Sequence, residues 1–146
     1  MLEKEKLLQE ANNAIKWIKE YVQASGAKGV VVGNSGGKDS ATVIAMSTKA
    51  LGADKVLAVS MPCNSIKEDL EDAKLVAETF GVRFLEVNLS DTYNELEKAI
   101  NSSLNLIDKE LSKEAKINIK PRLRMTSLYG IARKFRIFSS WNRKSL

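Results

Sequence analysis

GVVVGNSGGKDS, residues 29–40, joins an apolar run to a loop of small and polar residues. An apolar run without alternation is typical of a strand buried on both faces of a parallel sheet. The residues after the loop have helical periodicity, so the loop lies between a strand and a helix. Free N–H groups at a helix start attract anions, and glycine lets the backbone approach a ligand closely. The stretch therefore predicts an anion-binding loop in an α/β fold.

The rest of the chain alternates between the same two kinds of element. Expected strands cover residues 28–34, 55–61 and 82–89, and expected helices cover about 3–24, 39–51, 66–80, 90–111 and 117–134. This order predicts a single domain over residues 1–146: a doubly wound parallel sheet with helices on both faces, a Rossmann-like three-layer α/β/α architecture. No strand is expected after the last helix. The sheet is therefore expected to be incomplete at the C-terminus, with its first strand left as an edge.

Composition excludes several classes of site. The 146 residues contain no histidine and one cysteine, which rules out serine–histidine triads, histidine-ligated zinc and an internal disulfide. No stretch approaches the ~20 apolar residues that span a bilayer, and the N-terminus lacks a signal-type apolar block. We expect a cytoplasmic protein without a membrane partner.

Charge is unevenly distributed along the chain. Residues 1–112 carry 13 basic and 17 acidic side chains, a net of −4, whereas residues 113–146 carry 10 and 1, a net of +9. A basic segment can bind nucleic acid, but our main interpretation is a solvated basic helix, without a nucleic-acid partner.

The loop does not match the common phosphate-binding motifs. In the nucleotide triphosphatase loop a Ser or Thr follows the lysine, whereas here Asp39 follows Lys38, and no dinucleotide-binding glycine pattern occurs. A carboxylate beside phosphates is favourable when Mg²⁺ lies between them, because Mg²⁺ prefers carboxylate and phosphate oxygens. Asp39 is therefore a candidate metal ligand. The alternative is that Asp39 only stabilises the first turn of the helix.

The motif S-G-G-x-D-S after the first strand resembles the pyrophosphate loop of the N-type ATP pyrophosphatases. Two further stretches, MPCNSIKEDLEDAKLVAETFGV (residues 61–82) and NIKPRLRMTSLYGIA (residues 118–132), make the chain similar to ammonia-dependent NAD⁺ synthetase. The resemblance implies a homodimer that joins deamido-NAD⁺ and ammonia, with ATP as co-substrate and Mg²⁺ as cofactor. The reaction passes through an adenylate and releases AMP and pyrophosphate.

The resemblance also implies roles for individual residues. The ATP-binding positions are Gly33, Asn34, Ser35, Gly36, Gly37, Lys38, Asp39 and Ser40, with Asp39 also on Mg²⁺. Arg122 matches the family position that contacts deamido-NAD⁺, a role that suits the planar fork of arginine. Pro62 and Ser65 are expected to shape a turn near the adenine, and Cys63 is interpreted as a packing residue. No residue is assigned to catalysis.

The family pattern stops after about Phe135. The family continues with a strand, a VGTGN-like loop and an acidic Mg²⁺ ligand, whereas residues 136–146 read RIFSSWNRKSL. A DNA sequence can be written that encodes residues 136–145 in one reading frame. Read in the frame that begins one nucleotide later, the same DNA encodes GYLVVGTGN. Our hypothesis is a frame-slipped, truncated chain with weak or no ligase activity, and the alternative is a genuine, divergent C-terminus.

Two other functions stay open at this point. One is a pyrophosphate-loop enzyme that modifies transfer RNA, for which the basic segment would be suited. The other is a non-catalytic nucleotide-binding remnant. The sequence also does not decide between ammonia and a glutaminase partner as the source of nitrogen.

Overall fold

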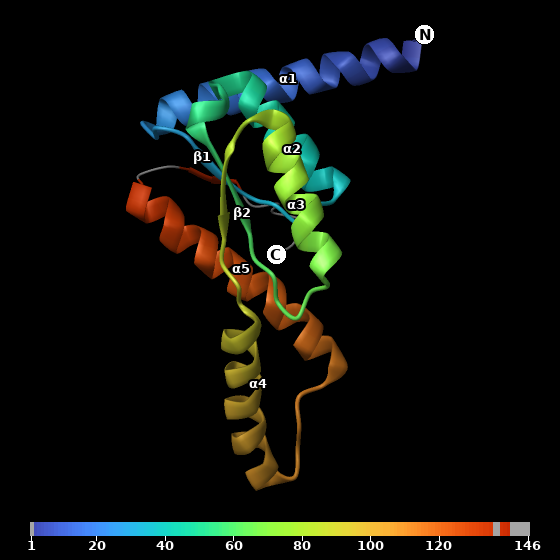
Figure 1. The fold of residues 1–146 in the computed structure, drawn as a ribbon, viewed down its shortest axis with the longest axis vertical. Coiled ribbons are helices and arrows are strands. Elements are labelled where there is room, and N and C mark those ends of the chain that lie inside the picture. Colours follow the sequence, from blue (N-terminus) through green and yellow to red (C-terminus); the bar gives the residue numbers. More distant parts are fainter. Residues whose placement is uncertain (1, 136–137, 141–146) are drawn as a thin grey trace.

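In a computed structural model the chain forms a parallel sheet with helices on both faces, which confirms the expected α/β class (Figure 1). The structure describes residues 2–135 and 138–140. The elements are α1 (Leu2–Ser25), β1 (Val30–Gly33), α2 (Lys38–Leu51), η1 (Ala53–Lys55), β2 (Val56–Ser60), α3 (Lys67–Phe80), β3 (Arg83–Glu86), α4 (Ser90–Leu104), η2 (Asn105–Ile107), α5 (Lys113–Phe135) and β4 (Phe138–Ser140).

The strands of the described sheet are all parallel and lie in the order β3-β2-β1-β4. β1 pairs with β2 in a register that sets Val30 opposite Val56, and β2 pairs with β3 in a register that sets Leu57 opposite Arg83. β2 is buried along its whole length, whereas β3 is largely exposed. Because the strands are parallel, their carboxyl ends meet at one edge of the sheet, where ligands bind in open α/β sheets.

The core has two halves, one on each face of the sheet. Side chains of a strand alternate between faces, so Val30 and Val32 point towards α1, α2 and α3, while Val31 points towards α4 and α5. The first half contains Val22, Val30, Val32, Ile44, Val56, Ala58, Ala77 and Val82. The second contains Val31, Leu57, Val59, Met61, Cys63, Leu89, Tyr93 and Leu128. This two-sided burial explains the continuous apolar run in β1.

The expectation that no strand follows the last helix is wrong. Residues Phe138–Ser140 form β4, which pairs with β1 and sets Phe138 opposite Val30. β1 is therefore an inner strand over Val30–Val32 and not an edge. Backbone pairing does not require apolar side chains, which is why the serine-rich stretch gave no strand signal. Residues 136–137 and 141–146 lie outside the described residues, and most of the stretch covered by the frame-slip hypothesis lies there.

The fourth predicted helix is shorter than expected. α4 ends at Leu104, seven residues before Leu111, and a 3₁₀ turn follows. Asp108 then adopts a left-handed conformation (φ 57°), which reverses the chain towards α5. Ser90 is the first residue of the helix, and its N–H donates to the Asn88 side chain at 3.0 Å. Asparagine and aspartate tolerate these local conformations, so the helix ended without a Gly or Pro signal.

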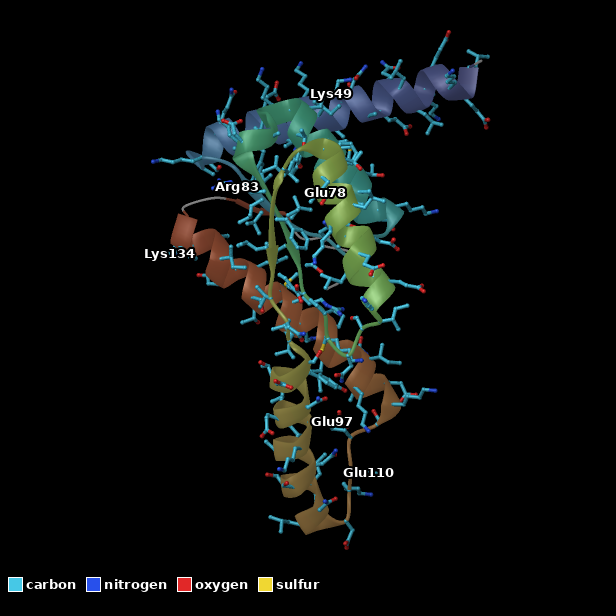
Figure 2. All side chains as sticks on the ribbon, viewed as in Figure 1. Lys49, Glu78, Arg83, Glu97, Glu110 and Lys134 are labelled. Atoms are coloured by element: carbon cyan, nitrogen blue, oxygen red, sulfur yellow. The ribbon has the colours of Figure 1, made fainter. Side chains whose placement is uncertain are left out.

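Charged side chains cover the outer surfaces of the helices (Figure 2). Lys49 on α2, Glu78 on α3 and Lys134 on α5 are exposed examples. Within residues 2–135 and 138–140, no helix combines the length and the apolar character needed to cross a membrane.

Candidate functional site

The expected anion-binding loop lies at the carboxyl edge of the sheet, between β1 and α2. Gly37 is the N-terminal cap residue of α2, and no side chain caps this end. Ala41 donates its N–H to the Gly37 carbonyl at 3.1 Å. The N–H groups of residues 38–40 precede this bond and have no acceptor within the helix. Together with the helix dipole they form a site for an anion.

Two serine hydroxyls lie at this helix start. The Oγ atoms of Ser35 and Ser40 lie 3.1 Å apart, and the Gly37 N–H donates to Ser35 Oγ at 3.3 Å. Hydroxyl hydrogen bonds are usually about 2.8 Å long, so these contacts are weak. A phosphate oxygen is a stronger acceptor and would replace them at little cost.

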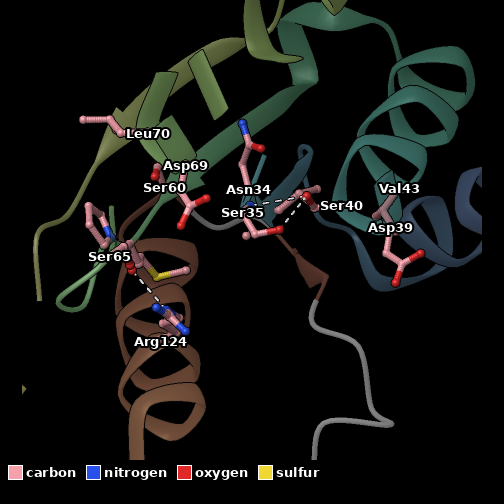
Figure 3. A pocket seen from close by; sticks show the side chains of 14 residues that line it. Asn34, Ser35, Asp39, Ser40, Val43, Ser60, Ser65, Asp69, Leu70 and Arg124 are labelled. Atoms are coloured by element: carbon pink, nitrogen blue, oxygen red, sulfur yellow. Dashed lines mark hydrogen bonds between the residues drawn. The ribbon is translucent and has the colours of Figure 1, made fainter. Parts of the chain in front are cut away.

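A cleft of about 660 Å³ opens beside the loop, within the usual range of about 300–1,000 Å³ for small-molecule sites (Figure 3). The end of β1 and the start of α2 form one side, and the segment after β2 forms another. Helices α3 and α5 contribute the remaining side chains. The lining residues are Val32, Gly33, Asn34, Ser35, Asp39, Ser40, Val43, Ser60, Met61, Pro62, Ser65, Asp69, Leu70 and Arg124.

The structure brings most of the residues proposed for ATP to this cleft. Those that line it are Gly33, Asn34, Ser35, Asp39 and Ser40, and the expected turn residues Pro62 and Ser65 line it as well. Gly36, Gly37 and Lys38 belong to the loop but are not among the lining residues. Arg122 also lies outside the lining. Its side chain is exposed, and its Nη1 donates to the Asn118 carbonyl one turn earlier at 2.9 Å.

Sequence reasoning missed the arginine that does line the cleft. Arg124 Nε donates to the Met61 carbonyl at 3.0 Å, which fixes a half-buried guanidinium at the wall (Figure 3). Residues two apart on a helix point in nearly opposite directions, so Arg122 and Arg124 cannot both face the cleft. A signal was present in the sequence, because Arg124 lies one turn before the apolar Leu128 and shares its inward face. Ser60, Met61, Asp69 and Leu70 were missed too.

The charged groups of the cleft come from three helices. Asp39 belongs to α2, Asp69 to α3 and Arg124 to α5 (Figure 3). In the described part of the chain, no cluster of three or more acidic or cysteine side chains could hold a metal ion. Mg²⁺ in nucleotide sites needs only one or two carboxylates, because phosphate oxygens and waters complete its coordination. The absence of such a cluster therefore does not conflict with Asp39 as a candidate ligand of Mg²⁺.

Cys63 is buried behind the cleft wall. Its Sγ lies 4.0 Å from the Leu89 carbonyl, among the residues of the second half of the core. Burial raises the pKa of the Cys63 thiol, although the charges of Arg124 and Lys120 act in the opposite direction. A neutral, buried thiol is a poor nucleophile, which supports its interpretation as a packing residue.

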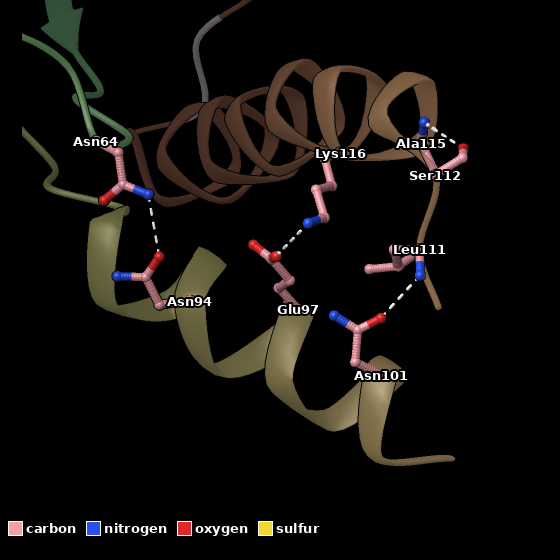
Figure 4. A network of polar contacts seen from close by, with 8 residues as sticks. All are labelled: Asn64, Asn94, Glu97, Asn101, Leu111, Ser112, Ala115 and Lys116. Atoms are coloured by element: carbon pink, nitrogen blue, oxygen red, sulfur yellow. Dashed lines mark hydrogen bonds and ion pairs between the residues drawn. The ribbon is translucent and has the colours of Figure 1, made fainter. Parts of the chain in front are cut away.

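Polar contacts with α4 hold the wall formed by the segment after β2. Asn64 donates its N–H to Ser90 Oγ at 2.9 Å, and its side-chain amide donates to Asn94 Oδ1 at 3.0 Å (Figure 4). Further along α4, Glu97 forms an ion pair with Lys116 of α5 at 3.0 Å. These contacts connect the cleft wall to α4, and α4 to α5, which carries Arg124.

A parallel α/β sheet with a glycine–serine loop leading into a helix start, beside a cleft of this size, is typical of α/β proteins of the nucleotide-binding class. The family model described as NAD synthase matches residues 10–139, and the chain belongs to this family. The matched range covers all of the cleft-lining residues.

Known relatives agree with this assignment. The chain is 40% identical over 130 residues to the NH₃-dependent NAD⁺ synthetase of Finegoldia magna, covering 88% of this chain and 51% of the relative. Among solved structures, an NH₃-dependent NAD synthetase from Campylobacter jejuni has a TM-score of 0.78 at 26% identity, covering 90% of this chain and 54% of that one. A glutamine-dependent NAD⁺ synthetase from Acinetobacter baumannii, in complex with ADP, has a TM-score of 0.78 at 30% identity, covering 86% and 23%.

The chain spans about half the length of the curated relatives it matches. The residues that the family model matches contain the loop, the cleft and α5.

Proposed function

We propose that the chain binds ATP with Mg²⁺ in the cleft and serves the amidation of deamido-NAD⁺ with ammonia. The observation that carries the proposal is the cleft at the carboxyl edge of the sheet, which a glycine–serine loop, Asp39 and Arg124 line in a member of the NAD synthase family. Cytoplasmic location and a homodimer stay predictions.

The reaction has two steps. A carboxylate oxygen of the nicotinate group attacks the α-phosphorus of ATP, and the bond to the bridging oxygen breaks, which releases pyrophosphate. Ammonia then attacks the activated carbonyl carbon and loses a proton, the bond to the adenylate oxygen breaks, and AMP leaves. The first step creates charge on the leaving pyrophosphate, so donors placed at that charge accelerate it.

The loop residues would act on the leaving group. The N–H groups of residues 38–40 and the hydroxyls of Ser35 and Ser40 surround one position at the start of α2. There they bind the β and γ phosphates and hold the pyrophosphate as it leaves. Asp39 would hold Mg²⁺. Bound Mg²⁺ neutralises the charge of the phosphate oxygens.

The two arginines of α5 would bind different substrates. Arg124 is fixed to the Met61 carbonyl at the cleft wall, so its guanidinium is pre-positioned for a phosphate inside the cleft. Arg122 is exposed on another face of the same helix, and we retain it as the contact for deamido-NAD⁺ outside the ATP cleft. Such a division lets one helix position both substrates.

A binding titration and an activity assay on the purified full chain test this proposal. We expect calorimetry to show one Mg²⁺-ATP site, and a coupled dehydrogenase assay with deamido-NAD⁺, ATP and ammonia to show at most weak formation of NAD⁺. ATP binding without NAD⁺ formation would support a nucleotide-binding remnant. Absence of ATP binding would overturn the proposal, and salt-sensitive binding of transfer RNA would favour the RNA-modifying alternative.

A further inference from the structure

Asn34 is a buried polar residue at the start of the loop, directly after β1, with 2% of its surface exposed. Its backbone N–H donates to the Val59 carbonyl at 2.7 Å, which continues the pairing of β1 with β2 by one residue. The residue borders the cleft, but its position is set from inside the protein.

Both polar atoms of the Asn34 side chain already have partners. Nδ2 donates to the Ala73 carbonyl of α3 at 2.7 Å, and Oδ1 accepts the Gly36 N–H at 3.1 Å. The first bond is shorter than the usual ~2.9 Å for an N–H donor. The amide therefore connects the loop to α3 across 39 residues of sequence.

Gly36 allows the loop and α3 to approach each other closely at the same place. Its φ of 80° lies in the left-handed region that favours glycine. A Cβ at this position would lie 2.8 Å from Asp72 Cβ and 3.0 Å from the Ala73 nitrogen, so any side chain would push the loop away from α3. Loop and helix thus meet through backbone contact at Gly36 and through the amide of Asn34.

We infer that Asn34 is a positioning residue that ties the phosphate loop to α3, and that its side chain is not a ligand of ATP. The tie keeps the Gly36 N–H on Asn34 Oδ1 and leaves anion binding to Ser35, Ser40 and the first turn of α2. It also sets the distance between the loop and the α3 wall that carries Asp69 and Leu70. The inference rests on the proposed function, because ATP is the ligand whose binding the tie would affect.

The first experiment measures the tie without any ligand. Amide hydrogen exchange by NMR on the full chain should show a Gly36 N–H protected in the wild type and at least about tenfold faster in Asn34→Leu, which has a similar volume but no acceptor. Asn34→Asp keeps the acceptor and loses the donor to Ala73, so Gly36 should stay protected there. Equal exchange of Gly36 in the wild type and Asn34→Leu would overturn the hydrogen bond from Gly36 to Asn34, and with it the loop end of the tie.

The second experiment measures Mg²⁺-ATP affinity in the same proteins. We expect Asn34→Leu and Asn34→Asp each to weaken binding about tenfold, because the loop is no longer held against α3. Asn101→Leu is the matched control, since the Asn101 amide also accepts a backbone N–H, that of Leu111, but lies far along α4 (Figure 4). It should bind ATP like the wild type.

A double-mutant cycle separates positioning from direct contact. Gly36→Ala disturbs the same junction from its other side, so its effect on ATP affinity should be less than additive with that of Asn34→Leu. Additive effects, or a large shift of the Asn34 side-chain amide resonances on adding ATP, would identify Asn34 as a ligand and overturn the inference. A protected Gly36 amide in a wild-type chain that binds no ATP would overturn only the proposed function.

Discussion

At the scale of single residues, the charge of Asp39 distinguishes this loop from one that binds phosphate through N–H groups alone. Asp39 borders the cleft from the first turn of α2. Asp39→Asn keeps the size of the side chain and removes the charge that would hold Mg²⁺. We expect ATP affinity in the presence of Mg²⁺ to fall about tenfold or more, as measured by calorimetry.

The control for this prediction is Asp54→Asn. Asp54 is exposed in η1, before β2, at the opposite edge of the sheet from the loop. The Asp54→Asn variant should leave ATP binding unchanged. In the absence of Mg²⁺, Asp39→Asn should bind ATP at least as well as the wild type, because a like charge near the phosphates has been removed. A variant that keeps the full response to Mg²⁺ would show that Asp39 only stabilises the helix start.

The two arginines of α5 predict different losses. Arg124→Gln removes the charge at the cleft wall and the donor to the Met61 carbonyl, so ATP binding should weaken about tenfold. Arg122→Gln should leave ATP binding unchanged and weaken the binding of deamido-NAD⁺, because its side chain is exposed outside the cleft. Separate titrations with the two nucleotides measure both effects. A loss of ATP binding in Arg122→Gln with none in Arg124→Gln would reverse the assignment.

Sequence alone located the loop but not the partners of its side chains. The motif and its place between strand and helix were enough to find residues 33–40, because local chemistry determines them. Whether Asn34 faces a ligand or α3 depends on Ala73, 39 residues away, and no local pattern encodes that contact. The same holds for Arg124, whose partner Met61 lies 63 residues away.

At the scale of the element, α4 and α5 are joined by an ion pair with a pH dependence. Hydrogen bonds from Lys116 and then from Tyr93 lower the pKa of Glu97, and the bond to Glu97 raises the pKa of Lys116. A lowered carboxyl pKa stabilises the fold above the unfolded value of about 4.3, and this contribution is lost as pH falls through the folded value. The lysine contribution is lost only as pH rises above about 10.4.

Glu97→Gln should therefore lower the melting temperature at pH 7 and flatten its decrease on acidification below about pH 5. Circular dichroism of the helices during heating, at a series of pH values, measures both. Glu95→Gln is the matched control on the same helix, where the side chain is exposed. If the melting temperature falls as steeply on acidification in Glu97→Gln as in Glu95→Gln, other carboxyl groups control the acid dependence of stability.

The elements themselves were largely predictable, and their ends were not. Apolar periodicity located α1 to α5 and β1 to β3, because burial on a sheet face imposes that periodicity. It overextended α4, since Ile107 and Leu111 continue the apolar spacing, although the Ile107 side chain is exposed. The helix ends before them because the chain reverses at Asp108, which depends on a left-handed backbone and not on hydrophobicity.

At the scale of the whole molecule, the family's fold is present from α1 to α5, while the chain spans about half of its curated relatives. The cleft lies inside the range that the family model matches. The expectation of weak or no ligase activity from this chain alone stays a prediction, and the coupled assay above measures it. Alternation of strands and helices made the architecture predictable, whereas β4 was missed because three residues with two serines carry no periodic signal.

The order β3-β2-β1-β4 makes the short β4 important for the whole sheet. β4 covers the backbone of β1 over Val30–Val32, where every side chain is buried. Ser139 lies opposite Val31, and Ser139→Pro would remove an N–H and restrict the backbone at the centre of this pairing. β1 would then become an exposed apolar edge, which is a site for pairing between chains.

We therefore expect Ser139→Pro to lower the melting temperature and to increase light scattering at concentrations where the wild type stays monodisperse. Ser139→Thr, which keeps the N–H and favours strands, should behave as the wild type does. Sedimentation velocity distinguishes aggregation from the predicted homodimer, because a dimer gives one discrete species. If Ser139→Pro sediments and melts like the wild type, pairing with β4 does not protect β1, and the inner position of β1 contributes nothing to the stability of the chain in solution.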